Sequence, residues 1–250
     1  MQALIINGSA RGSRGVTQRL AQALGQGLQD GGATTEQVLL KDLEIAPCLA
    51  CLSCMHKHPG RCAQRDGMDE IYPRLQQADL LVLGAPVYTD NMPAKLKAVI
   101  DRCICAMLPF WEEGEAGRMR HPLAWPLPAQ FVLLSVAGFP EPVTFEPLIA
   151  TFRAQAYNFR STPLAEFCIP GAIALQFEPA ALEGHLAWLR QAGREIAQEG
   201  RPNPVTAARI NRPPLSKDRC RELNLRYEDW CRKQQAKAGS KQGRAGFGRE

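Results

Sequence analysis

Residues 3–17 read ALIINGSARGSRGVT, and this stretch decides the fold class. Four apolar residues come first, and a polar loop with three glycines follows them. A helical pattern of apolar residues then runs from about Val16 to Leu28. An apolar run, a glycine turn and an amphipathic segment predict a strand, a loop and a helix in that order. The stretch therefore predicts an α/β unit.

The same alternation of strand and helix repeats as far as residue 200. The continuous apolar run of residues 79–84 is typical of a strand buried on both faces of a sheet. Five strand-then-helix units predict a parallel sheet with helices on both faces and right-handed crossovers. The expected strands are 3–6, 38–40, 79–84, 130–136 and 165–169, and the expected helices are 16–28, 68–75, 93–107, 145–159 and 179–198.

Composition and charge divide the chain into two parts. Of the 250 residues, 45% are hydrophobic and 22% are charged, which is the balance of an ordinary globular protein. We expect one domain over 1–200, with a cysteine-rich insertion at 41–67. Residues 201–250 form a basic extension with 13 Lys and Arg against 5 acids. We expect it to hold one helix, over 217–234, and to end in a disordered tail at 236–250.

Several classes of protein and of location are disfavoured. The basic extension carries no zinc-finger, RNP or helix-turn-helix pattern, so we do not expect nucleic acid as a partner. No apolar run has the length of a membrane-spanning helix, and the N-terminal sequence MQALIINGSARG is unlike a signal peptide. Nine cysteines in such a chain indicate reduced thiols. We therefore expect a cytoplasmic protein that uses cysteine for metal binding or redox chemistry.

The loop from Gly8 to Thr17 is expected to bind an anion. It follows a strand and opens a helix, which brings backbone N–H groups and hydroxyls to one place where a phosphate would be held. The loop lacks the Gly-Lys-Ser/Thr of ATP-binding loops and the G-x-G-x-x-G of dinucleotide folds. A lone phosphate is the better ligand. The alternative is a plain strand-to-helix turn, which glycine and serine also form.

A second loop, from Gly84 to Pro93, leaves the third expected strand. Ligands of parallel sheets bind at the carboxyl ends of the strands. This loop offers backbone amides and the ring of Tyr88, which suit a planar ligand such as an isoalloxazine ring. The alternative is that Tyr88 is a half-buried loop aromatic and that the prolines only turn the chain.

Cysteines are concentrated at one place in the insertion, within fifteen residues: Cys48, Cys51, Cys54 and Cys62. Three thiols at two-residue intervals can surround one metal centre, and the fourth arrives from a later turn. Iron–sulfur clusters are held by four thiolates in compact runs of this kind, whereas structural zinc sites pair two separated CxxC knuckles. The spacing favours a cluster, and zinc or a metal-free loop are the alternatives.

Three segments together resemble the NADPH-dependent FMN reductase and iron–sulfur flavoprotein superfamily. They are Gly8-Ser9-x-Arg11, Ala85-Pro86-Val87-Tyr88 and the helical segment 95–102, KLKAVIDR. The cysteine block resembles the compact motif of the iron–sulfur members, which commonly have glycine where this chain has Ala50. The resemblance covers residues 1–200.

This resemblance implies a flavodoxin-like fold with strand order 2-1-3-4-5, and homodimers or homotetramers. It implies that the phosphate of an FMN cofactor is held by Ser9, Arg11, Ser13 and Thr17. It implies that the flavin lies beside Pro86, Val87, Tyr88 and Asn91. It also implies a 4Fe-4S cluster near the flavin, bound by Cys48, Cys51, Cys54 and Cys62.

We therefore expect an FMN-dependent oxidoreductase or electron-transfer flavoprotein with a 4Fe-4S cluster. NADPH or NADH is the candidate electron donor, and a redox partner protein or a small molecule is the candidate acceptor. Because the flavin itself carries electrons, no catalytic side chain is expected. One alternative is a cluster-free NAD(P)H-dependent FMN or quinone reductase. Another is a redox-responsive binding module whose cysteine loop changes shape on oxidation.

Overall fold

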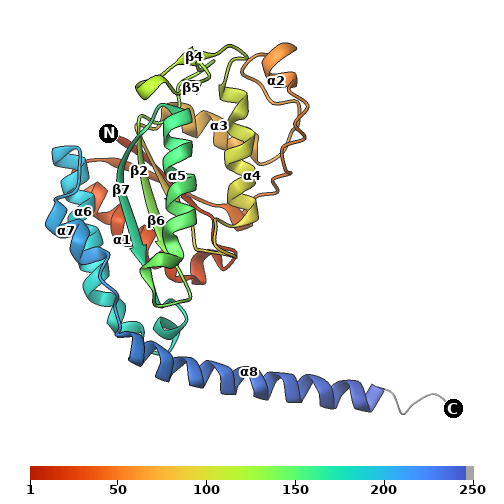
Figure 1. Ribbon diagram of the computed structural model, residues 1–250, viewed down its shortest axis with the longest axis vertical. Helices are drawn as coiled ribbons and strands as arrows, with labels where there is room; N and C mark the ends of the chain where they lie inside the picture. The colour runs from red at the N-terminus through yellow and green to blue at the C-terminus, as the bar shows by residue number, and fades with distance from the viewer. Residues whose placement is uncertain (246–250) are drawn as a thin grey trace.

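The computed structural model describes residues 1–245, with side chains as far as residue 237. A five-stranded parallel sheet runs through its centre in the order β2-β1-β3-β6-β7 (Figure 1). The order 2-1-3-4-5 is thereby confirmed, since β4 (Glu112–Glu113) and β5 (Met119–Arg120) form a separate antiparallel ribbon. The five strands of the sheet are β1 (Gln2–Asn7), β2 (Thr34–Leu39), β3 (Leu80–Gly84), β6 (Gln130–Val136) and β7 (Thr162–Ile169).

Helices cover both faces of the sheet, because the central strands are apolar on both sides. In β1, Ala3 and Ile5 belong to one buried cluster, and Leu4 and Ile6 belong to the other. The first cluster is closed by α1 (Val16–Asp30), α6 (Glu183–Glu199) and α7 (Pro204–Ile210). The second is closed by α3 (Met68–Gln77), α4 (Ala94–Arg102) and α5 (Glu146–Phe159).

Glycines let α1 and α6 approach each other closely. A Cβ atom at Gly27 would lie 2.0 Å from the carbonyl oxygen of Arg190, and one at Gly193 would lie 2.4 Å from that of Leu24. Both distances are far inside van der Waals contact, so only glycine fits at these crossings. The contact holds α1 firmly on the sheet, and the first loop opens directly into this helix.

Several elements extend beyond their predicted bounds, β2 and α8 by the most residues. Strand β2 begins at Thr34 rather than residue 38, because its first residues, TTEQ, lie at the exposed edge of the sheet and carry no apolar signal. Helix α8 spans Lys217–Ala245, so the structure is helical over residues 236–245, where the sequence predicts disorder. Alanine, lysine, glutamine and arginine in that segment are good helix formers. The rest of the predicted tail, 246–250, lies outside the described residues.

Helix α8 leaves the body of the molecule (Figure 1). Its first turns pack through Cys220 and Leu223 against Ala174, and no later side chain as far as residue 237 is buried. Among the described residues, no helix combines the length and the apolar character needed to cross a membrane. Short helical turns complete the chain: α2 (Ser53–His56) and the 3₁₀ segments Gly12–Arg14, Leu40–Asp42, Cys103–Ala106, Glu115–Gly117, Pro142–Phe145, Ala174–Gln176 and Pro179–Leu182.

Candidate functional site

The first loop is fixed by the buried side chain of Asn7 at the end of β1. Its Oδ1 accepts a hydrogen bond from the backbone N–H of Ser9 at 2.9 Å, and its Nδ2 donates to Oε1 of Gln18 at 2.8 Å. The N–H of Gly8 donates to the carbonyl oxygen of Gly84 at 2.8 Å, which joins the first loop to the second. The two loops therefore meet at the carboxyl end of the sheet.

The amino terminus of α1 faces this junction without a compensating negative charge. Its N-cap residue is Gly15, no side chain caps the helix, and the first turn contains no acid. The partial positive charge of the helix dipole and the free N–H groups of the first turn attract anions. The nearly buried hydroxyls of Ser9 and Thr17 and the exposed Arg11 lie beside it. These groups form a site suited to a phosphate.

The second loop uses part of its backbone donors within the fold, so fewer amides are available to a ligand than the sequence suggests. The N–H of Val87 donates to the carbonyl oxygen of Val136 at 2.8 Å, and that of Tyr88 donates to the carbonyl oxygen of Asn91 at 2.8 Å. Continuation of the sheet and a tight turn consume these amides. The turn residues Thr89 and Asp90 have φ of 46° and 64°, a strained conformation for residues with side chains. Tyr88 remains 43% exposed.

A cavity of about 280 Å³ opens where these loops meet. Six of the eight residues predicted to bind FMN line it: Ser9, Arg11, Thr17, Pro86, Val87 and Tyr88. A further wall comes from segments that follow β6 and β7, and the sequence analysis did not identify it: Val136, Gly138, Ala172, Ile173 and Gln176. The convergence of strand ends in a parallel sheet was the available signal, but these residues carry no charge that would have drawn attention to them.

Two predicted residues lie outside the lining of this cavity. Ser13 is exposed in the 3₁₀ turn Gly12–Arg14 of the first loop. The side chain of Asn91 is occupied elsewhere, since its Nδ2 donates to Oγ1 of Thr151 at 3.1 Å and its Oδ1 accepts from the N–H of Met92 at 2.8 Å. Asn91 thus ties the second loop to α5.

The four clustered cysteines all line a second, smaller cavity. Cys54 is buried, Cys48 and Cys62 are half-buried, and Cys51 is exposed. Burial and the neighbouring thiols, Cys62 foremost, raise the pKa of Cys54. A fifth thiol, Cys105, also lines this cavity, and burial raises its pKa to about 12, which keeps it neutral near pH 7. From sequence, Cys105 was interpreted only as a small buried hydrophobe.

The shape of the cysteine cavity is closed. Its volume is about 20 Å³, roughly the space of one water molecule. In the described part of the chain, no group of three or more His, Cys, Asp or Glu side chains is arranged to hold a metal ion. The donor set fits a thiolate-bound group, whereas the volume requires the loop to open. Ala50 and Leu52 have φ of 50° and 52°, so this loop is strained at two residues that carry side chains.

Arg102 holds the two stems of the cysteine loop together. Its Nη1 donates to Oδ2 of Asp66 at 2.8 Å and to the carbonyl oxygen of Ala46 at 3.0 Å, and its Nη2 donates to Oδ1 of Asp66 at 3.3 Å. Asp66 in turn accepts from the N–H groups of Ala46 and Met68. The side chain of Arg102 is fully buried, and that of Asp66 is 13% exposed. This ion pair therefore fixes residues 46 and 66 at the base of the loop.

Replacement of Asp66 by asparagine is expected to destabilise the protein in a pH-dependent way. Burial opposes ionisation of Asp66, but the hydrogen bonds from Arg102 and two backbone amides outweigh it and hold its pKa below the usual range. The ion pair therefore stabilises the fold fully above the ordinary carboxyl pKa of about 4, and the contribution is lost as pH falls through the lowered value. Removing one partner of a buried pair costs about 3–5 kcal/mol.

Urea unfolding of the wild type and of Asp66→Asn tests this expectation. The difference in unfolding free energy should be largest near pH 7 and should shrink below about pH 4. Glu183→Gln is the control, because Glu183 pairs with Arg19 at the surface and should change stability little at either pH. A difference that does not change with pH would contradict the assigned role of Asp66.

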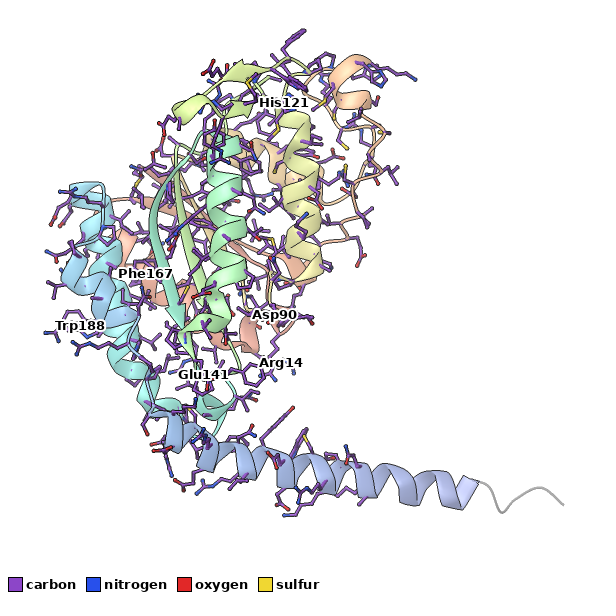
Figure 2. The ribbon with its side chains drawn as sticks, viewed as in Figure 1. Arg14, Asp90, His121, Glu141, Phe167 and Trp188 are labelled. Carbon is purple, nitrogen blue, oxygen red and sulfur yellow. The ribbon has the colours of Figure 1, made fainter. Side chains whose placement is uncertain are left out.

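The two cavities lie at opposite ends of α4. The larger cavity is at the carboxyl ends of the strands, where Figure 2 shows Arg14 and Asp90, and the cysteine cavity contacts Arg102 and Ile104 at the far end of α4. Helix α2 also lies at that far end (Figure 1). The two cavities share no lining residue. Within one chain the cysteines are therefore not adjacent to the predicted flavin position, which differs from what the resemblance implies.

The fold and the larger cavity define a flavodoxin-like α/β protein with a cavity at the carboxyl edge of its sheet. Residues 1–123 match the model of the family described as NADPH-dependent FMN reductase. The resemblance to this family is therefore confirmed. An iron–sulfur flavoprotein from Methanosarcina thermophila is 37% identical over 99 residues, which are 40% of this chain and 50% of that protein. The chain spans about half the length of the curated relatives it matches.

Solved structures share the fold at low sequence identity. The NAD(P)H:quinone oxidoreductase from Methanothermobacter marburgensis is 19% identical with a TM-score of 0.55, and the match covers 78% of this chain and 95% of that one. RosB, solved with 8-demethyl-8-formylriboflavin-5'-phosphate, is 14% identical with a TM-score of 0.57, and the match covers 91% and 87%. These likenesses support the flavodoxin-like fold across the chain.

Proposed function

We propose that this chain is an FMN-dependent oxidoreductase that carries a 4Fe-4S cluster on Cys48, Cys51, Cys54 and Cys62. The observation that carries the flavin part is the cavity of about 280 Å³, in which an uncapped helix terminus adjoins the ring of Tyr88. An anion site beside an aromatic and aliphatic wall suits a ligand with a phosphate at one end and a planar ring at the other. The family match at residues 1–123 supports the same ligand.

The phosphate of FMN is assigned to the first loop and the ring to the second. The hydroxyls of Ser9 and Thr17, the guanidinium of Arg11 and the first-turn amides of α1 bind the phosphate, with Ser13 at the outer side of the loop. Pro86, Val87 and Tyr88 border the ring, and Asn91 positions this loop by holding it on α5. When bound, FMN supplies hydride and single-electron transfer, and the chain orients it and limits access of water.

The cluster assignment is supported by the cysteines themselves. All four line one cavity, and none of the nine cysteines of the chain forms a disulfide. Several curated relatives are named iron–sulfur flavoproteins, including those from Methanosarcina thermophila and Methanocaldococcus jannaschii. Nine free thiols suit a reducing compartment, and we accordingly assign the protein to the cytoplasm.

The proposed function also suggests an electron donor, an electron acceptor and an oligomeric state. We assign NADPH or NADH as the electron donor, and a redox protein or a small molecule as the acceptor. Large apolar side chains stand exposed away from the FMN cavity, among them Leu49, Phe110 and Trp111, at 68%, 64% and 76% exposure. Such exposure supports a homodimer or homotetramer in which these residues are covered.

A cluster-free NAD(P)H-dependent FMN or quinone reductase is the second candidate. The small volume of the cysteine cavity, about 20 Å³, favours this candidate, because a loop without a bound group is expected to close on itself. In that case the clustered cysteines bind no metal and take no part in electron transfer, and the flavin alone passes electrons to a diffusible acceptor.

The deciding experiment is analysis of flavin, iron and acid-labile sulfide in the full chain, purified without oxygen. One FMN with about four irons and four sulfides per chain is the expected result. FMN without iron or sulfide, reduced rapidly by NADPH, would establish the second candidate. A protein that neither retains nor rebinds FMN would overturn both proposals.

A further inference from the structure

The side chain of Arg102 has one donor that its loop-anchoring role does not use. Its Nη1 and Nη2 atoms bind Asp66 and the carbonyl oxygen of Ala46, as described above. Its Nε atom is buried and has no hydrogen-bond partner among the described residues. A buried, unpaired donor on a charged group is costly, by about 1–3 kcal/mol or more. Such an atom calls for an acceptor that the described side chains do not supply.

The surroundings of Arg102 identify the chemistry of that partner. The arginine lines the cysteine cavity together with the four clustered cysteines. Burial opposes the charge of the guanidinium, but the hydrogen bond to Asp66 outweighs it and raises the pKa of Arg102, so the side chain is a buried cation. The hydroxyl of Tyr72 donates to the carbonyl oxygen of Arg102 at 3.2 Å, and the thiol of Cys105 also lines the cavity. Five of the residues that line the cavity with Arg102 are cysteines, so sulfur is the most abundant acceptor there for Nε–H.

We propose that Arg102 is a positioning residue for the sulfur-bound group of the cysteine cavity, and that its Nε–H donates a hydrogen bond to an anionic sulfur of that group. This inference rests on the proposed cluster. A cluster with its thiolates is negatively charged, and a fully buried cation beside it offsets that charge. Hydrogen bonds to cluster sulfurs and nearby charge set the reduction potential. Arg102 therefore raises the potential at which the group accepts an electron.

The fork geometry of arginine explains why lysine does not suffice here. Arginine presents five N–H donors in a rigid plane, so one side chain can grip Asp66 with its outer nitrogens and still point Nε elsewhere. Lysine has a single nitrogen, which Asp66 would occupy. Arg102→Lys thus preserves the positive charge and most of the loop anchor but removes the donor to sulfur. Asp66→Asn does the reverse, since it weakens the anchor and keeps Nε–H.

Redox titration of these variants, followed by electron paramagnetic resonance on anaerobically purified full-length protein, tests the proposal. In Arg102→Lys we expect wild-type iron content and an equilibrium constant for reduction at least tenfold lower, a fall of about 59 mV for a one-electron couple. In Asp66→Asn we expect an unchanged or higher potential. Arg153→Lys is the matched control, because Arg153 makes a two-pronged ion pair with Glu166 on β7 and neither residue lines the cysteine cavity or the FMN cavity.

The outcomes separate the proposals. If Arg102→Lys has the iron content and the reduction potential of the wild type, the proposed role of Nε is refuted but the proposed cluster is not. Equal loss of iron in both variants, with no opposite shift in potential, would show that Arg102 only anchors the loop. A wild-type chain without iron and sulfide would overturn both this role and the proposed cluster. If Arg102→Lys does not fold, wild-type protein labelled with ¹⁵N-arginine should show coupling of one arginine nitrogen to the reduced cluster by electron–nuclear double resonance, and its absence would refute the proposal.

Discussion

Gly15→Asp is expected to lower the affinity for FMN at least about a hundredfold while leaving the fold intact. The new carboxylate would stand at the N-cap of α1, beside Ser9 and Arg11, at the proposed phosphate site. Like charges brought together in a binding site cost several kcal/mol, and a hundredfold loss corresponds to about 2.7 kcal/mol. The backbone at Gly15 has φ of −87°, which a side chain can adopt, and the new Cβ atom would lie 3.0 Å from Oγ of Ser9, which must shift by a few tenths of an ångström.

Stability distinguishes this effect from simple damage. Aspartate is a favourable N-cap residue, and replacing glycine by it changes helix stability by only a few tenths of a kcal/mol, in the stabilising direction. Fluorescence titration of apoprotein with FMN measures the affinity, and thermal unfolding of the apoprotein measures the fold. Gly184→Asp is the control, since it adds the same charge in the first turn of α6 with no atom within 4 Å of the new Cβ. Equal FMN affinity in Gly15→Asp and the wild type would move the phosphate away from this loop.

Cys54→Ser is expected to remove nearly all iron and sulfide from the chain and to leave FMN bound. Cys54 is the most buried of the four clustered cysteines, at 6% exposure, and a serine hydroxyl does not replace a thiolate as a cluster ligand. The FMN cavity shares no residue with the cysteine cavity, so flavin content should stay at the wild-type level. Assays on anaerobically purified protein measure the iron, acid-labile sulfide and FMN bound per chain.

Cys168→Ala supplies the control for cysteine loss. Cys168 lies on β7 at the far edge of the sheet and lines neither cavity. Its iron content should match that of the wild type. Retention of four irons by Cys54→Ser would contradict the ligand assignment. Parallel loss of iron and FMN would instead indicate that Cys54 supports the fold.

Periodicity predicted the sheet because its central strands are apolar on both faces. Residues 80–84 are all buried, and a short run of apolar residues of this kind predicts an inner strand of a parallel sheet. The edge strand β2 was predicted only from residue 38, because its exposed half is polar. Strand pairing rather than composition decides where an edge strand begins.

Some residues of the candidate sites could be predicted from the sequence, and others could not. Residues next to a strand end, such as Ser9 and Pro86, could be assigned from sequence because their position follows from the fold. The role of Arg102 could not, because Asp66 and Ala46, which orient it, are more than thirty residues away in the chain. The hydrogen bonds of Val87 and Tyr88 were equally invisible, since they depend on β6 and on the turn at residues 89–90.

The separation of the two cavities along α4 has a consequence for maturation of the protein. Because no residue serves both cavities, insertion of one prosthetic group neither completes nor obstructs the binding surface of the other. For the proposed FMN and cluster we therefore expect either order of loading, with flavin-only and cluster-only molecules both stable enough to isolate. We consequently expect the cluster content per chain to rise and fall with the iron supply of the culture, while the flavin content per chain stays constant.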